Sequence, residues 1–134
     1  MTMKDLQPAG WTPPKGYANG VMADGIMIFV AGQVGWTGEQ RFESDDFVAQ
    51  TEQALRNIVA VLAEADARPD HVVRLTWFIL DKREYLSRLE EVGAAYRRVM
   101  GRHFPAMTMV QVSALIEDRA KVEIEATAVL PRAG

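Results

Sequence analysis

The chain has 134 residues, a length that fits one domain with a substantial hydrophobic core. Its formal net charge of -3 gives no general attraction to nucleic acid or to an anionic membrane. Cysteine is absent, which excludes disulfides, thiolate nucleophiles and sulfur-ligated metals. No apolar stretch is long enough for a secretory signal or a membrane span, so we expect one soluble cytoplasmic domain over residues 1–134.

The first part of the chain predicts an irregular lead-in followed by a β-hairpin. Residues 1–16 are rich in proline and glycine, which disfavour regular structure. Residues 17–35 then predict two strands that pair around Asp24-Gly25, a dipeptide preferred in tight hairpin turns. Gly32 interrupts the second strand and predicts a bulge or a close backbone approach.

Two helical segments separated by a strand come next. Residues 44–66 predict a helix that begins with Ser44 as its N-cap. Residues 71–80 are rich in β-branched and aromatic side chains and predict a strand. A second helix is expected from Asp81, a capping residue, to Gly101, which suits a C-terminal cap. Its apolar stripe consists of Tyr85, Leu89, Val92, Tyr96 and Val99.

Residues 107–115 and 120–130 predict the last two strands. In the final strand, apolar residues alternate with Glu123 and Glu125, which places the two carboxylates together on the other face. The element order β-β-α-β-α-β-β predicts an α+β fold with two helices on one face of a sheet. The opposite face mixes apolar and polar groups, so we expect it to meet another subunit in an oligomer.

Few motifs of known chemistry occur in the sequence. The nucleophile-elbow, phosphate-loop, dinucleotide and metalloprotease motifs are absent. His71 and His103 lack the spacing of a metal site, and we expect neither a metal nor a cofactor. Glu123 and Glu125 have two interpretations: they form an ion pair with a basic group such as Arg74, or a carboxylate holds water and moves protons.

Several further residues also have a structural and a functional interpretation. Tyr17 either packs in the core or forms a cleft wall with a polar tip. Gln33 either satisfies backbone groups or orients a substrate, and Trp36 is interpreted first as a packing residue. A basic cluster near the end of the second helix is interpreted as a solvated helix end, with anion binding as the alternative; it consists of Arg97, Arg98 and Arg102.

Nearly the whole chain, roughly residues 13–131, resembles the Rid family of YjgF-type reactive-intermediate deaminases. The resemblance rests on seven segments in the family's order and spacing: "GYANGV", "VAGQVG", "QTEQALRNIVAVLAEADA", "VVRLTWFILDKREY", "AAYRRVM", "FPAMT" and "VEIEATAV". It implies a chorismate-mutase-like fold and a homotrimer in which three sheets line a central barrel and clefts lie between subunits. It also implies hydrolysis of imines or enamines to ketones and ammonia without a cofactor.

The resemblance assigns expected roles to individual residues. Tyr17 corresponds to the cleft tyrosine, and Gly32 to the glycine whose backbone approaches the ligand. Glu123 corresponds to the glutamate that positions or activates water, and Phe104 begins the segment that leads to the family's carboxylate-binding arginine. The position of that arginine is occupied by Met107.

Two more polar positions of the family are changed in this chain. Ala31 stands where a serine is expected, and Gly93 where an asparagine is expected. Loss of a bidentate arginine contact costs a carboxylate ligand about 2–5 kcal/mol, or roughly tens- to thousands-fold in affinity. Met107 instead suits an apolar or aromatic ligand, and Trp36 is a candidate for one wall of the cleft.

Three functions follow as hypotheses. The first is hydrolysis of an imine, an enamine or a related intermediate with an apolar or aromatic moiety, rather than a small 2-imino acid. The second is a homotrimer that binds a small metabolite without catalysis, because three polar positions are lost. The third, RNA cleavage, is disfavoured by the net charge and by the lack of a basic aromatic surface. We therefore expect a small-molecule ligand and self-association, and neither nucleic acid nor a membrane as partner.

Overall fold

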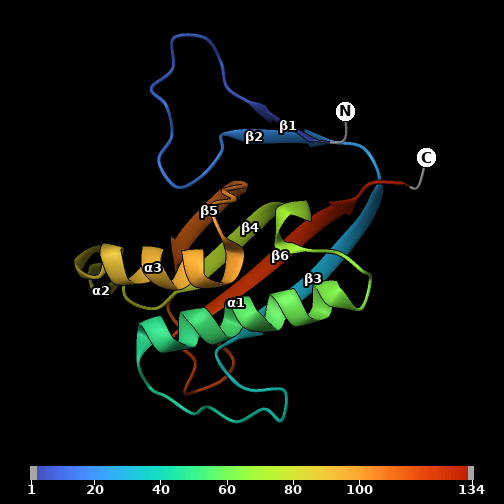
Figure 1. Cartoon of the computed structure of the whole chain (residues 1–134). Helices are drawn as coiled ribbons and strands as arrows, with labels where there is room; N and C mark the ends of the chain where they lie inside the picture. The colour runs from blue at the N-terminus through green and yellow to red at the C-terminus, as the bar shows by residue number, and fades with distance from the viewer. Residues whose placement is uncertain (1–2, 133–134) are drawn as a thin grey trace.

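A four-stranded mixed sheet with helices on one face forms the body of the protein (Figure 1). The computed structural model describes residues 3–132. The strand order is β3-β6-β4-β5, in which β5 runs parallel to β4 and the other pairs are antiparallel. The strands of this sheet are β3 (Ile26–Val34), β4 (Val72–Ile79), β5 (Ala106–Gln111) and β6 (Val122–Leu130).

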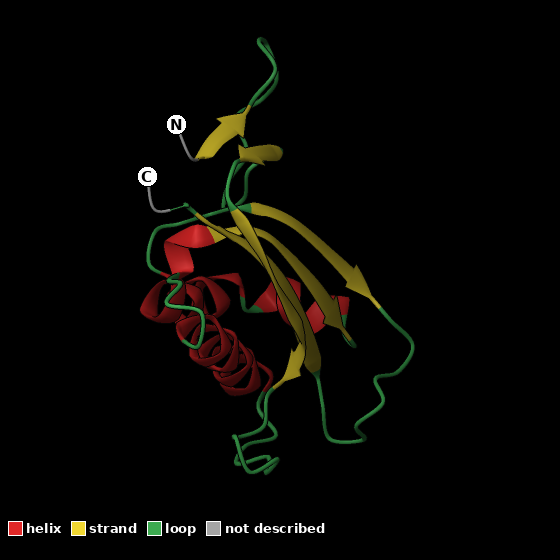
Figure 2. Ribbon diagram, turned by 90° about the vertical axis from the view of Figure 1, so that its right-hand side faces the viewer, coloured by secondary structure: helices red, strands yellow, loops and turns green. Residues whose placement is uncertain are grey.

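The helices pack on one face of this sheet, and within residues 3–132 no element covers the other face (Figure 2). They are α1 (Phe47–Ala63), the short 3-10 helix η1 (Pro69–His71), α2 (Lys82–Ser87) and α3 (Leu89–Met100). Alternate residues of β6 are buried beneath the helices, among them Val122 and Ile124, as the sequence pattern predicts. The α+β fold expected from the sequence is therefore confirmed. No helix in the described part of the chain is long and apolar enough to cross a membrane.

The predicted hairpin around Asp24-Gly25 is wrong. Strand β2 (Gly20–Ala23) pairs with β1 (Met3–Leu6) in a separate two-stranded sheet, so the start of the lead-in is regular, whereas residues 7–16 are irregular as expected. Strand β3 pairs with β6 instead. Gly25 has a φ of 150°, and a Cβ there would overlap the backbone of Leu130. The dipeptide therefore allows the chain to pass closely over the end of β6, rather than to fold back on β2.

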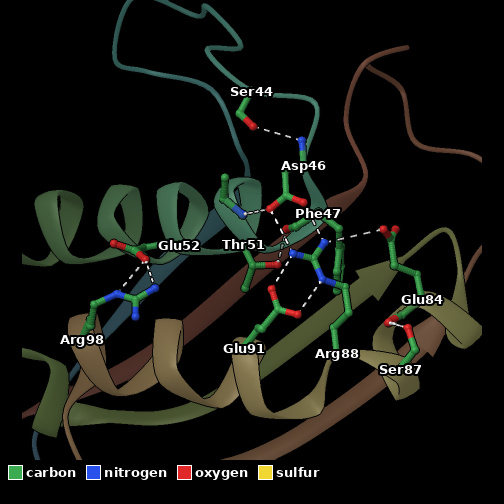
Figure 3. Close-up of polar contacts among 11 residues, drawn as sticks. Ser44, Asp46, Phe47, Thr51, Glu52, Glu84, Ser87, Arg88, Glu91 and Arg98 are labelled. Atoms are coloured by element: carbon green, nitrogen blue, oxygen red, sulfur yellow. Dashed lines mark hydrogen bonds and ion pairs between the residues drawn. The ribbon is translucent and has the colours of Figure 1, made fainter.

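Helix α1 begins with a different cap from the one predicted. The side chain of Asp46, not that of Ser44, accepts a hydrogen bond from the Ala49 N–H at 3.0 Å. Ser44 lies two residues earlier, and its hydroxyl accepts a hydrogen bond from the Asp46 N–H (Figure 3). A carboxylate is favoured at the helix start because it also interacts with the positive end of the helix dipole. The charged residue therefore takes the capping position.

The single helix predicted between Asp81 and Gly101 is divided into α2 and α3. Both predicted caps are confirmed, but Arg88 between the two helices leaves the helical conformation, with φ -128° and ψ 32°. Its guanidinium forms ion pairs of 2.7 Å with Asp46 and with Glu91 (Figure 3). This arginine joins the start of α1 to the start of α3, an interaction between distant segments that helical periodicity does not report.

Candidate functional site

A cavity of about 470 Å³ lies between α3, the edge of the sheet and the lead-in. Most of its wall is aromatic or thioether surface, and its lining contains two basic side chains and no acidic one. The aromatic and methionine residues of the wall are Tyr17, Trp77, Tyr85, Tyr96, Phe104, Met107 and Met109, and the basic ones are Lys15 and Arg97. Such a surface favours a ligand with a planar or apolar body.

Met107 reaches this cavity through the register of the edge strand β5. It pairs with Leu75 of β4, a fully buried core residue, and therefore faces the helices. Met107 is partly buried and packs against the core; it also borders a hollow on the opposite face at the open edge of β5. The residue that stands in place of the expected arginine is thus part of the wall of a real cavity.

The lead-in closes one side of the cavity. Ala18 forms a parallel bridge with Ala106, and its N–H donates to the carbonyl of Pro105 at 3.0 Å. This anchoring places the neighbouring Tyr17 in the cavity wall, where 43% of its surface remains exposed. Tyr17 therefore belongs to the wall of the cavity and not to the core.

A stack of aromatic rings forms the deeper part of the wall. Tyr96 lies 5.4 Å from Phe104 and 6.3 Å from Trp77, measured between ring centroids. Burial raises the pKa of Tyr96 well above its usual value, so its hydroxyl stays protonated and donates to the carbonyl of His103 at 2.5 Å. The bond fixes the chain next to Phe104 and so keeps the stack in place.

A second group of predicted site residues lies on the opposite face of the sheet. The register of β3 shifts between Val30 and Gln33, so the bulge expected at Gly32 is present. The carboxylate of Glu123 occupies the space beside Gly32, where any Cβ would overlap it. Ala31 is exposed next to this pair, and its carbonyl accepts from the Gln33 side chain at 3.1 Å. Gly32 and Glu123, which the sequence suggests as separate site residues, are therefore in direct contact.

One chain does not bring the two groups together. Glu123 points away from the helices because its neighbours in β6 are buried beneath them, whereas Met107 points toward them. Trp36 lies in neither group, since it follows β3 and contacts Phe42 at 5.6 Å. Gly93 of α3 lines the cavity beside Met107. The sequence-predicted residues therefore form a cavity group, a Glu123 group and a separate Trp36.

The remaining predictions concern the two glutamates of β6, the two histidines and a metal site. Within residues 3–132, neither Glu123 nor Glu125 forms an ion pair with Arg74. His103 bonds to the carbonyl of Val72 through Nε2, and His71 accepts from a backbone N–H through Nδ1. No group of three or more His, Asp or Glu side chains in the described range is placed to hold a metal ion.

Sequence reasoning missed several residues of the cavity. Tyr85, Leu89, Val92 and Tyr96 were expected as an apolar helix stripe, and their role as cavity wall depends on a gap between α3 and β5 that periodicity does not reveal. Trp77 was expected only as a strand residue. Arg97 was interpreted as part of a solvated helix end, although it lines the cavity.

Comparison with known protein families identifies the chain. The model of the family described as Endoribonuclease L-PSP matches residues 10–130. The chain belongs to this family, the Rid or YjgF family. A RutC family protein of Synechocystis sp. is 33% identical to this Rid protein over 138 residues, which cover 98% of this chain and 99% of the relative.

Two further comparisons place this Rid protein among its relatives. A 2-iminobutanoate/2-iminopropanoate deaminase of Salmonella typhimurium is 32% identical over 108 residues, covering 78% of this chain and 80% of that protein. The crystal structure of the Rid-family protein YyfB of Yersinia pestis, whose function is unknown, superimposes with a TM-score of 0.86 at 30% identity, covering 97% and 100% of the two chains. The resemblance inferred from sequence is confirmed, and so is the chorismate-mutase-like fold.

Proposed function

We propose that this Rid protein hydrolyses an imine or enamine whose non-reacting part is apolar or aromatic. The observation that carries the proposal is the cavity around Met107, whose wall is built mainly from aromatic rings and thioethers. The Salmonella relative is named for hydrolysis of small 2-imino acids. In this chain the expected arginine of such a site is Met107, so the floor of the cavity offers dispersion contacts in place of a fixed charge.

The reaction needs a water molecule and a group that moves protons. Glu123 accepts a proton from water as the water oxygen attacks the imine carbon, and the imine nitrogen gains a proton. The hydroxyl proton of the resulting carbinolamine then passes to the nitrogen as the C–N bond breaks, which releases ammonia and leaves the ketone. Gly32 has no side chain, so the Glu123 carboxylate lies directly against its backbone, and the reacting atoms are expected to meet both groups there. Tyr17 closes the cavity from the lead-in.

The site is completed by a second copy of the chain. Glu123 and the cavity lie on opposite faces of one sheet, so we infer that the Glu123 face of one copy meets the cavity edge of another. The uncovered face carries large apolar residues, including Phe29, which is 71% exposed, and Met27, which is 58% exposed. Surfaces of this kind favour burial in a symmetric oligomer. A homotrimer with three shared sites fits this arrangement.

Replacement of Glu123 by Gln tests the catalytic role. It preserves the size of the side chain but removes the proton acceptor, so we expect turnover of aromatic imines to fall about 10²–10⁴-fold with little change in ligand binding. Glu125→Gln is the matched control, because Glu125 is exposed two residues away on the same face and does not contact Gly32. Unchanged turnover in Glu123→Gln would show that this carboxylate has no part in the reaction.

A non-catalytic binding protein is the second candidate. It is favoured by the loss of polar groups at Ala31, Gly93 and Met107, which leaves Glu123 as the main functional group of the predicted set. Under this alternative, aromatic imines and their ketones raise the melting temperature, but no ammonia is released. The described surface gives no comparable support to RNA cleavage.

A further inference from the structure

The cavity places positive charge at its exposed side and apolar surface at its buried side. Lys15 and Arg97 are exposed, whereas Trp77 and Tyr96 are almost completely buried. The cavity wall contains no acidic residue that would neutralise the two cations. Within residues 3–132, neither Lys15 nor Arg97 has a carboxylate within ion-pair distance. This distribution favours a ligand with an apolar body and an anionic end.

Arg97 differs from Arg88 and Arg98, which lie on either side of it in the sequence. Arg88 and Arg98 both form ion pairs with carboxylates (Figure 3). Arg88 pairs with Glu91 at 2.7 Å, and Arg98 pairs with Glu52 at 2.6 Å. Arg97 lies immediately before Arg98 in the same helix and contributes to the cavity wall instead. Its guanidinium therefore keeps its hydrogen-bonding capacity for another partner, and it has five N–H donors in a planar fork.

The glycine at position 93 explains how Arg97 reaches the cavity. A Cβ at Gly93 would lie 3.1 Å from a guanidinium nitrogen of Arg97, so the guanidinium lies over the helix backbone one turn before its own Cα. This direction leads away from the free carbonyls at the helix end near Gly101. The contact is therefore not the one that a solvated helix end predicts. The asparagine expected at position 93 would occupy part of this space.

A buried donor without a partner lies in the same wall. Nε1 of Trp77 is the only buried side-chain nitrogen or oxygen in the described part of the chain that has no hydrogen-bond partner. A buried N–H without an acceptor costs about 1–3 kcal/mol. Trp77 is a member of the cavity wall, so a ligand that carries an acceptor on its apolar part is a chemically suitable partner.

We propose that the cavity binds an aromatic carboxylate and that Arg97, at the exposed side, holds the carboxylate in place of the arginine lost at position 107. This inference rests on the proposed use of the cavity as the ligand site and names the class of ligand. The charge is held at the rim, so the ligand extends from Arg97 to the aromatic wall beside Met107. A small 2-imino acid has no group long enough to use both regions. Arg97 is thus a specificity-determining residue.

Phenylacetate and phenylacetamide are suitable probes, because they share the ring and differ in charge. In an NMR titration of the wild-type protein, we expect the acid to bind about tenfold more tightly than the amide. Arg97→Gln, which preserves a good helix former at an exposed position, should remove this preference and leave the affinity for the amide unchanged. Arg98→Gln is the matched control and should retain the preference, because Arg98 faces Glu52.

The outcomes separate this proposal from the proposed reaction. Equal affinities for acid and amide in the wild type, or a preference that survives in Arg97→Gln, would overturn the role of Arg97. If neither probe binds, the cavity is not the ligand site, and the proposed function fails together with this inference. If the acid binds through Arg97 but no aromatic imine is hydrolysed, the ligand class is supported and only the reaction is excluded.

Discussion

Met107 determines, in our account, which ligands the cavity accepts. A guanidinium at this position would add a fixed charge at the partly buried edge of β5, among aromatic side chains. Met107→Arg should therefore gain hydrolysis of small 2-imino acids and lose affinity for aromatic ligands by about tenfold or more. Met107→Leu, which conserves the apolar volume, is the control and should retain the wild-type preference. Kinetic constants for both substrate classes provide the measurement.

Equal preferences in the wild type and in Met107→Arg would show that position 107 does not govern substrate choice. A drop in melting temperature alone would not produce the predicted change of preference, because it lowers both activities together. The control variant separates loss of the thioether from gain of the charge.

At the scale of residues, the sequence predicted contacts that depend on neighbours in the chain or on the family's motifs. The Gly32 bulge and the candidate role of Glu123 are predicted in this way, whereas the contact between the two residues is seen only in the structure. The involvement of Trp77 and Arg97 was not found, because both depend on how α3 packs against the sheet edge. A basic residue near a helix end has an ordinary interpretation, and only its direction in space distinguishes the alternatives.

At the scale of elements, one network connects the starts of α1 and α3. Asp46 caps α1 and also pairs with Arg88 at 2.7 Å (Figure 3). Asp46→Ala removes both interactions and should lower the free energy of unfolding by about 1 kcal/mol. Asp46→Asn preserves a capping oxygen and should cost less. Asp45→Ala is the control, since the neighbouring Asp45 pairs only with Arg119 at an exposed position.

The same network predicts how stability depends on pH. The Arg88 hydrogen bond, followed by that of the Ala49 N–H, lowers the pKa of Asp46. The pKa of this carboxyl is lower in the folded protein than its value of about 4 in the unfolded chain. Its contribution to the stability of the fold is therefore complete above about pH 4 and is lost as the pH falls through the folded pKa. The free energy of unfolding of the wild type, measured with urea, should therefore fall below about pH 4. Asp46→Asn should show a shallower decline, and an identical decline would contradict this assignment.

Periodicity predicted the existence and type of most elements, but not their pairing. The helices and the final strand follow from apolar spacing, because one face of each must be buried. The hairpin at Asp24-Gly25 was predicted incorrectly because the close approach to Leu130, a residue distant in the chain, decides the partner of β3. The break at Arg88 likewise coincides with ion pairs to another helix.

At the scale of the whole molecule, the uncovered sheet face connects the fold to the function. It carries exposed Phe29 and Met27 together with Glu123, and it lies opposite the cavity. A monomer would leave this apolar surface in water and the two halves of the site apart. We therefore propose that copies of the chain assemble as a homotrimer, an arrangement that accounts for polar groups on a face that is also apolar.

Complementation between inactive copies tests the shared site most directly. Glu123→Gln removes the proton acceptor, and Gly93→Phe fills the cavity from a position in its wall, where a Cβ meets only the flexible end of Arg97. Each variant alone should be inactive. When both are refolded together into mixed trimers, about a quarter of wild-type imine hydrolysis should return, because some interfaces then combine an intact cavity with an intact Glu123. Mixed trimers that form but hydrolyse no imine would contradict a site shared between copies.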